Sequence, residues 1–168
     1  PTSHKQLDAF LALLKDTGIV VRLDTNGTNP QAIKDLIARK LLDCIAMDIK
    51  SPLQKAKYEL VSGVPCNIED IEKSIRIIME SGIEYEFRTT VCPSQLDGDD
   101  IEEIARTIEG ARRYILQGFR PNHCLDSKML KIEPYPVETL RGFASCAGKY
   151  VDYCCVRGEE GMVLQRNW

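Results

Sequence analysis

The sequence predicts an α/β protein built on a parallel sheet. Short β-branched runs alternate along the chain with longer segments whose apolar residues recur at helical spacing. Each expected strand also follows an expected helix, a pattern typical of parallel strands joined by right-handed crossovers. A barrel, a partial barrel and an open sheet all satisfy this pattern. No linker or break in composition divides residues 1–168, so a single domain is expected.

Boundary signals in the first half of the chain are clear. Leu7, Leu11 and Leu14 share one helical face, and Gly18 ends that helix. Asn29 as N-cap followed by a proline begins the next helix. The expected elements are a helix at 4–16, a strand at 19–24, a helix at 29–41, a strand at 44–50 and a short helix at 54–61.

The second half repeats the pattern. Asn67 caps a helix that ends at Gly82, and acidic residues from Asp97 to Asp100 suit the positive end of another helix, which stops at Gly110. A long loop is expected at 118–136. The remaining expected elements are strands at 84–91, 113–117 and 150–156 and a last helix at 137–147.

Composition narrows the classes of function. A formal net charge of -3 provides no broad attraction to nucleic acid or to anionic membrane. The apolar runs are far shorter than the ~20 residues of a membrane-spanning helix, and no signal-peptide pattern is visible. The 7 cysteines are odd in number and scattered, which favours a reducing cytoplasm over a disulfide framework.

The expected strands are unusual because charged residues alternate with apolar ones. A parallel sheet covered on both faces should read as continuous apolar runs. Here Arg22 and Asp24 alternate with leucine and valine, and the strand at 84–91 places Glu84, Glu86 and Arg88 on one face. Side chains point to opposite faces with a period of two, so helices are expected to cover only the apolar face.

Polar residues also gather where the strands end. They are Asp24, Asp48, Lys50, Arg88 and Gln117, and the carboxyl edge of α/β sheets is where ligands bind. Each of them alone is compatible with a turn or a structural ion pair. Four successive strands that place polar residues on the same face and at the same end favour a polar cavity. Such a cavity suits a zwitterionic ligand whose carboxylate meets the cations and whose ammonium meets the carboxylates.

Other candidate groups carry weaker signals. His4 is expected to be solvated, and His123 with Cys124 lacks partners at a known metal-site spacing. The chain contains no closely spaced cysteine pair of the CxxC or CxxxC kind, no P-loop and no GxSxG motif. Three cysteines near the end fit no common cluster pattern and are expected to be buried free thiols: Cys146, Cys154 and Cys155.

Four segments in order resemble the radical S-adenosylmethionine proteins. They are VRLDTNGT at 21–28, DCIAMDIKSP at 43–52, YEFRTTV at 85–91 and YILQGFRP at 114–121. Within that superfamily the resemblance is to the anaerobic ribonucleoside-triphosphate reductase activating proteins, near the pyruvate formate-lyase activating enzymes. It covers roughly residues 1–158.

The resemblance implies a partial (β/α)6 barrel of the TIM type, to which this chain contributes about the third to sixth strands with a C-terminal helix and strand. The family binds a [4Fe-4S] cluster through a CxxxCxxC loop and S-adenosylmethionine through a GGEP-type motif. Pro1 and Thr2 resemble the end of that motif. The chain would thus be an N-terminally truncated piece, and alone it is expected to hold no cluster and to be inactive.

The resemblance also implies roles for individual residues. Asp24 and Thr25 would lie by the amino-acid end of S-adenosylmethionine, at a cation site with the backbone of Met47, and Gln117 would lie by its adenosine. The implied S-adenosylmethionine-binding residues are Asp24, Thr25, Asn26, Met47, Asp48, Lys50, Arg88 and Gln117. No catalytic side chain is expected in this chain, because the cofactors supply the reactivity. No metal ligand is expected either, because the cysteines that bind the cluster in the family are absent from this chain.

In the family, an electron from the reduced cluster cleaves S-adenosylmethionine, and the resulting 5′-deoxyadenosyl radical removes a hydrogen atom from a glycine of a partner enzyme. The implied partners are a glycyl radical enzyme, here anaerobic ribonucleoside-triphosphate reductase, and an electron donor such as flavodoxin or ferredoxin. Self-association through the exposed edge of the barrel is a further expectation.

Three other readings stay open. Lys50 beside Asp48 could form a Schiff base in a cluster-free barrel lyase or aldolase. A radical protein that modifies a small molecule would carry similar motifs. A ligand-binding domain that kept the barrel and lost the chemistry would bind S-adenosylmethionine without turning it over.

Overall fold

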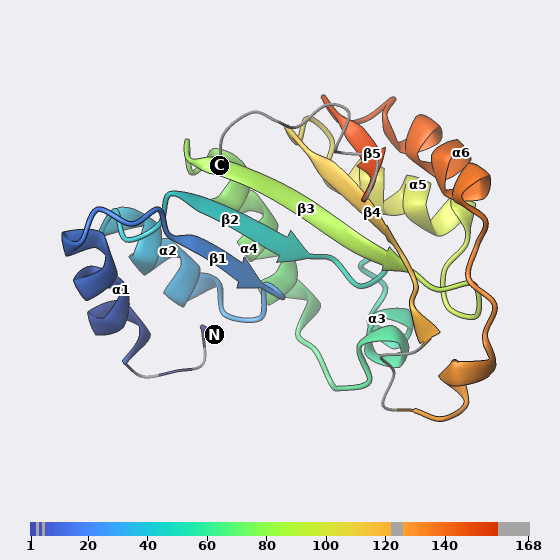
Figure 1. Ribbon diagram of the computed structural model, residues 1–168, viewed down its shortest axis with the longest axis horizontal. Coiled ribbons are helices and arrows are strands. Elements are labelled where there is room, and N and C mark those ends of the chain that lie inside the picture. Colours follow the sequence, from blue (N-terminus) through green and yellow to red (C-terminus); the bar gives the residue numbers. More distant parts are fainter. Residues whose placement is uncertain (3, 5, 122–125, 158–168) are drawn as a thin grey trace.

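The computed structural model describes residues 1–2, 4, 6–121 and 126–157 (Figure 1). Its centre is a sheet in which all strands are parallel and lie in chain order. The strands are β1 (Arg22–Thr25), β2 (Cys44–Asp48), β3 (Glu84–Val91), β4 (Tyr114–Gly118) and β5 (Cys154–Val156). The predicted α/β class is therefore confirmed, and the sheet is consistent with a partial barrel.

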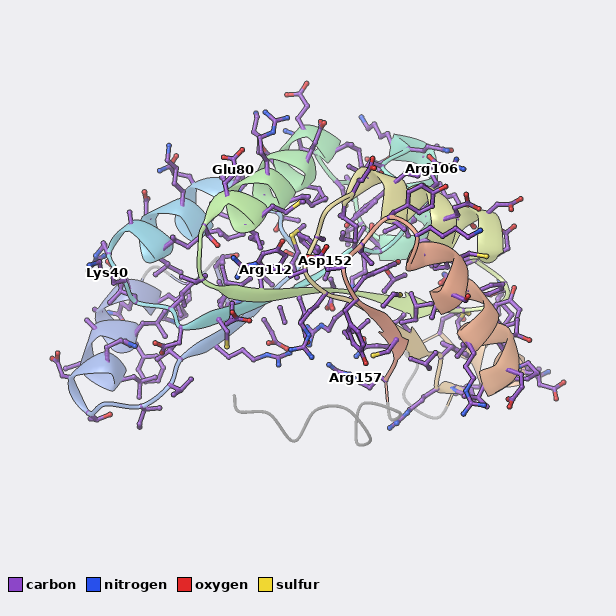
Figure 2. All side chains as sticks on the ribbon, turned by 90° about the horizontal axis from the view of Figure 1, so that it is seen from above. Lys40, Glu80, Arg106, Arg112, Asp152 and Arg157 are labelled. Carbon is purple, nitrogen blue, oxygen red and sulfur yellow. The ribbon has the colours of Figure 1, made fainter. Side chains whose placement is uncertain are left out.

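The crossover helices α4 and α5 lie on one side of this sheet (Figure 2). When parallel strands follow one another in chain order, every right-handed crossover passes over the same face. Figure 2 shows α4 and α5 above the sheet, whereas Arg157 lies below it. The helices are α1 (Leu7–Asp16), α2 (Pro30–Ala38), α3 (Lys55–Ser62), α4 (Ile68–Glu80), α5 (Gly98–Thr107) and α6 (Val137–Ala147), with a 3-10 turn η2 (Met129–Lys131) in the connection before α6.

The hydrophobic core fills the space between the sheet and the helices. Met47, Phe87 and Tyr114 point from neighbouring strands into it and are fully buried. On the helix side, α4 and α5 contribute buried isoleucines such as Ile78 and Ile104. Burying large apolar side chains is the main source of stability for such a layer, at about 1.5–3 kcal/mol each.

The expected helix starts are present. The Asn29 side chain accepts a hydrogen bond from the Ala32 N–H at 3.1 Å, and Asn67 accepts one from Glu69 at 3.2 Å. Asp97 forms a reciprocal capping box with Asp100. These contacts satisfy backbone donors that a helix leaves unpaired at its first turn.

Three strands are shorter than the sequence predicts. Residues 19–21 precede β1, because the Val21 N–H donates to the Asp43 carboxylate at 2.7 Å in place of a ladder partner. Strand β2 ends at Asp48, two residues early. Residues 150–153 turn away from α6 before β5, where Tyr150 donates to the Ala147 carbonyl.

The cysteine prediction is partly wrong. Cys146 is exposed on the surface of α6, and Cys154 and Cys155 are half-buried. Free cysteines are usually buried, but Cys146 lies on the exposed face of α6. An apolar run around a cysteine therefore does not decide whether its thiol is buried. His4 is exposed as expected, whereas His123 and Cys124 lie outside the described residues. Among the described residues, no helix is long and apolar enough to span a membrane.

Gly27 shapes the turn after β1. Its φ is +76°, and a Cβ at this position would overlap the Cε atom of Met47 and lie 3.0 Å from its sulfur. The Gly27 carbonyl also accepts a hydrogen bond from Ser74 of α4 at 2.6 Å. The turn that carries the end of β1 is therefore packed directly on the core.

We expect Gly27→Ala to lower the free energy of unfolding by about 2–4 kcal/mol, through left-handed backbone strain and overlap with Met47. Gly63→Ala is the matched control, because its φ is +72° and no atom lies within 4 Å of the added Cβ. The control should cost only about 1 kcal/mol. Urea unfolding measures both values, and equal losses would contradict the role of Met47.

Candidate functional site

The face of the sheet away from α4 and α5 carries the predicted polar residues. We call it the open face, formed by Arg22, Asp24, Asp48, Glu86, Arg88, Gln117 and Arg157. Strand register explains why they share it, since Asp48 pairs with Arg88 across β2 and β3, and Thr90 pairs with Gln117 across β3 and β4. Side chains of directly opposed residues point to the same side of a sheet.

Arg88 joins two strands at the centre of the open face. Its Nε lies 2.9 Å from Oδ1 of Asp48, and one terminal nitrogen lies 2.9 Å from Oδ2 of Asp24. The Arg88 side chain is only 8% exposed, whereas those of Asp24 and Asp48 are 54% and 31% exposed, so water screens these contacts in part. Its planar guanidinium therefore holds both carboxylates in one arrangement.

The Asp24 carboxyl is held in its ionised form. Partial burial by itself raises its pKa, but hydrogen bonds from Arg22 and Arg88 outweigh this effect and keep the pKa below its usual range. Arg22 Nε lies 2.8 Å from Oδ1 of Asp24. Asp24 thus contributes a stable negative charge at the carboxyl end of β1.

Lys50 follows the end of β2 beside these residues. Its Nζ lies 3.4 Å from Oδ2 of Asp48, and its side chain is 37% exposed. Among the described residues this long contact is the one ion pair of the ammonium group, which stays within reach of an external carboxylate. A lysine that forms Schiff bases usually needs a desolvated amine, and the exposure of Lys50 gives the aldolase reading no support.

Four side chains, those of Arg22, Glu86, Gln117 and Arg157, form a second cluster that spacing along the sequence does not predict. Glu86 accepts hydrogen bonds from Arg22 at 2.8 Å and from Arg157 at 3.3 Å. With its amide oxygen turned towards Arg157, Gln117 accepts from that guanidinium at 3.0 and 3.2 Å. Charge alternation along β1 and β3 predicts that Arg22 and Glu86 lie on the polar face of the sheet. Only the pairing of β4 with β5 brings Arg157 close to them.

Two other predicted residues, Thr25 and Met47, have buried side chains that share the opposite face of the sheet. Thr25 is buried and its hydroxyl accepts from the Gly27 N–H at 3.2 Å, while Asn26 accepts from Thr28. The Met47 side chain is fully buried in the core, so only its backbone could face a ligand, as the resemblance implies. The structure thus brings together the side chains of Asp24, Asp48, Lys50 and Arg88. It buries those of Thr25 and Met47 and pairs Gln117 with Arg157 instead.

The described residues do not fit an iron–sulfur cluster. Within 1–2, 4, 6–121 and 126–157, no group of three or more histidine, cysteine or acidic side chains could hold a metal ion. The paired anions and cations of the open face do match the carboxylate and ammonium of an amino-acid-like ligand.

No protein-family model matches the chain. It is 36% identical, over 168 aligned residues, to a protein of Methanocaldococcus jannaschii named as a glycyl-radical enzyme activating enzyme, and the match covers 96% of this chain and 68% of that protein. The chain belongs to the glycyl-radical enzyme activating enzymes.

A second protein of the same organism and name is 30% identical over 110 residues, which is 63% of this chain and 41% of that relative. The crystal structure of a domain of pyruvate-formate lyase-activating enzyme from Bacteroides vulgatus matches the fold, with a TM-score of 0.70 and 17% identity. That match covers 90% of this chain and 89% of the domain. The chain and the Bacteroides vulgatus domain therefore share a fold.

The lowered pKa of Asp24 predicts a pH effect on stability. The ionised carboxyl stabilises the folded state above the unfolded pKa of about 3.9, and this contribution is lost as pH falls through the lower folded value. Asp24→Asn should therefore lower stability by about 0.5–1 kcal/mol at pH 7, with the difference shrinking below about pH 4.

Unfolding by urea at a series of pH values measures this difference. The exposed Asp152 provides the control, and Asp152→Asn should lower stability by less at pH 7. A difference for Asp24→Asn that stays constant from pH 7 down to pH 2 would contradict the assignment.

Proposed function

We propose that the open face binds S-adenosylmethionine and that the whole protein uses it to activate a glycyl radical enzyme, specifically anaerobic ribonucleoside-triphosphate reductase. One observation carries the proposal. Arg88 holds the carboxylates of Asp24 and Asp48 together at the carboxyl ends of β1 and β2, with the Lys50 ammonium beside them. Ligands of α/β sheets bind at this edge.

The charges on this face suit the amino-acid end of the ligand. Lys50 can bind the carboxylate, while Asp24 and Asp48 can accept hydrogen bonds from the ammonium group. Gln117 lies on β4, farther across the sheet, in the direction where an extended ligand would place its adenosine. We propose that Asn26 and the backbone of Met47 line the same end as Asp24.

The arrangement is held before any ligand arrives. Asp24 and Asp48 are fixed by Arg88, and Arg22 is fixed by Glu86, so the polar groups need little reordering on binding. Radical chemistry in such an enzyme comes from S-adenosylmethionine together with a [4Fe-4S] cluster, and we propose both as cofactors of the whole protein. The residues of this chain bind and orient the ligand.

We further propose a cytoplasmic location and a flavodoxin- or ferredoxin-type electron donor. The free cysteines in the described part of the chain support a reducing compartment: Cys44, Cys66, Cys92, Cys146, Cys154 and Cys155. One edge of β1 has no strand partner among the described residues, which supports the expectation of self-association.

Isothermal titration of the chain with S-adenosylmethionine tests the ligand. We expect Lys50→Met to weaken binding about tenfold or more, because a charge-assisted hydrogen bond to the ligand carboxylate is lost. Lys34→Met is the control, since Lys34 is an exposed lysine on α2. No heat of binding with the unchanged chain, or equal losses in the two variants, would overturn the proposal.

The choice of target is tested by association. We expect the chain, immobilised on a biosensor surface, to bind anaerobic ribonucleoside-triphosphate reductase about tenfold more tightly than pyruvate formate-lyase. Specificity for one target is the difference between the two binding free energies, and a tenfold difference in Kd corresponds to about 1.4 kcal/mol. Each enzyme serves as the control for the other. Equal affinities, or tighter binding of the lyase, would reject the reductase as the target and leave the ligand proposal standing.

A further inference from the structure

The peptide bond between Ile49 and Lys50 lies just beyond the end of β2, yet both of its polar atoms are paired. The Thr89 hydroxyl donates to the Ile49 carbonyl at 2.9 Å. The Lys50 N–H donates to the hydroxyl of Tyr58 at 3.3 Å. Side chains thus replace the ladder partners that a strand would supply, and they hold this peptide bond from two directions.

The hydroxyl groups that hold the peptide bond are buried. Tyr58, Thr89 and Tyr114 are each at most 2% exposed, and the Tyr114 hydroxyl donates to Thr89 at 2.8 Å. Burial raises the pKa of Tyr58 to about 12 and also raises that of Tyr114, so both hydroxyls keep their protons at neutral pH. A buried hydroxyl group without a hydrogen-bond partner destabilises the folded state. These hydroxyl groups are therefore kept in the one arrangement that pairs them.

We propose that Tyr58 and Thr89 are positioning residues for Lys50. They fix the plane of the peptide bond that leads into Lys50, and this plane sets the direction in which its side chain leaves the backbone. The side chain therefore starts out towards Asp48, which brings its ammonium group to the place where it meets the ligand carboxylate. This inference rests on the proposed function, in which Lys50 binds S-adenosylmethionine.

Helix α3, which carries Tyr58, is also attached to α5 independently of the hydroxyl. Lys57 forms an ion pair with Asp100, and Gln54 donates to Glu103 at 2.9 Å. Removing the Tyr58 hydroxyl therefore leaves α3 in place and releases only the Lys50 N–H. Thr89→Val keeps the shape of the side chain and releases the Ile49 carbonyl, and it also removes the acceptor of the Tyr114 hydroxyl.

The experiment combines amide hydrogen exchange with titration by S-adenosylmethionine. In Tyr58→Phe we expect the Lys50 amide to exchange about tenfold faster, since its hydrogen bond is lost, and ligand binding to weaken about tenfold. Thr89→Val should weaken binding in the same direction, and Thr89→Ser should restore it. In a Lys50→Met background, neither Tyr58→Phe nor Thr89→Val should weaken binding further.

Tyr85→Phe is the matched control. Tyr85 is as buried as Tyr58, and its hydroxyl accepts from the Arg112 N–H at 3.2 Å at the opposite end of the strands. This variant loses the same chemical group and the same kind of hydrogen bond. It should speed exchange at Arg112 and leave both the Lys50 amide and ligand affinity unchanged.

The outcomes separate the two proposals. An unchanged rate of amide exchange at Lys50 in Tyr58→Phe would overturn the positioning role. Tyr58→Phe or Thr89→Val weakening binding in the Lys50→Met background as much as in the unchanged chain would overturn it too. Equal weakening by Tyr85→Phe would show a general loss of stability and would also overturn it. Faster exchange at Lys50 in a chain that binds no S-adenosylmethionine would reject the proposed ligand and retain the control of the Lys50 backbone.

Discussion

The placement of every functional group follows from one constraint, the chain-order arrangement of parallel strands. Because each right-handed crossover returns the chain over the same face, α4 and α5 can cover only one side of the sheet. The other side receives no helix from these crossovers. Apolar residues such as Phe87 consequently face the helices, and charged residues such as Arg88 face away from them.

Charges placed together on the open face must neutralise one another. Glu86 and Arg88 have side chains that are 5% and 8% exposed, and unpaired ions at such positions would be strongly destabilising. Each is paired with two partners of opposite sign, which the structure draws from β1, β2 and the end of β5. Lys50 differs, because its ion pair within the described part of the chain is long and its side chain is partly exposed, so it is able to bind a ligand. The ion pairs thus make the site rigid, and Lys50 is the cation that they leave able to bind a ligand.

Much of this arrangement could be predicted from local patterns. Alternation with a period of two assigns Asp24, Asp48 and Arg88 to one face, and Asn29 and Asn67 predict where helices begin. The four ordered segments indicate the family that the M. jannaschii relative then showed. Strand ends were less predictable, because a side chain such as Asp43 can take the place of a strand partner.

The sequence by itself determined the class of fold, the polar face and its main charged residues, because these depend on spacing along the chain. Tertiary structure decided which charges pair, since Glu86 binds Arg22 and Arg157 through strands that are distant in sequence. It also decided how Lys50 is held, because the hydroxyls of Tyr58 and Thr89 meet one peptide bond only after α3 and β3 have packed together. Contacts of this kind depend on register and packing in three dimensions, which no local pattern encodes.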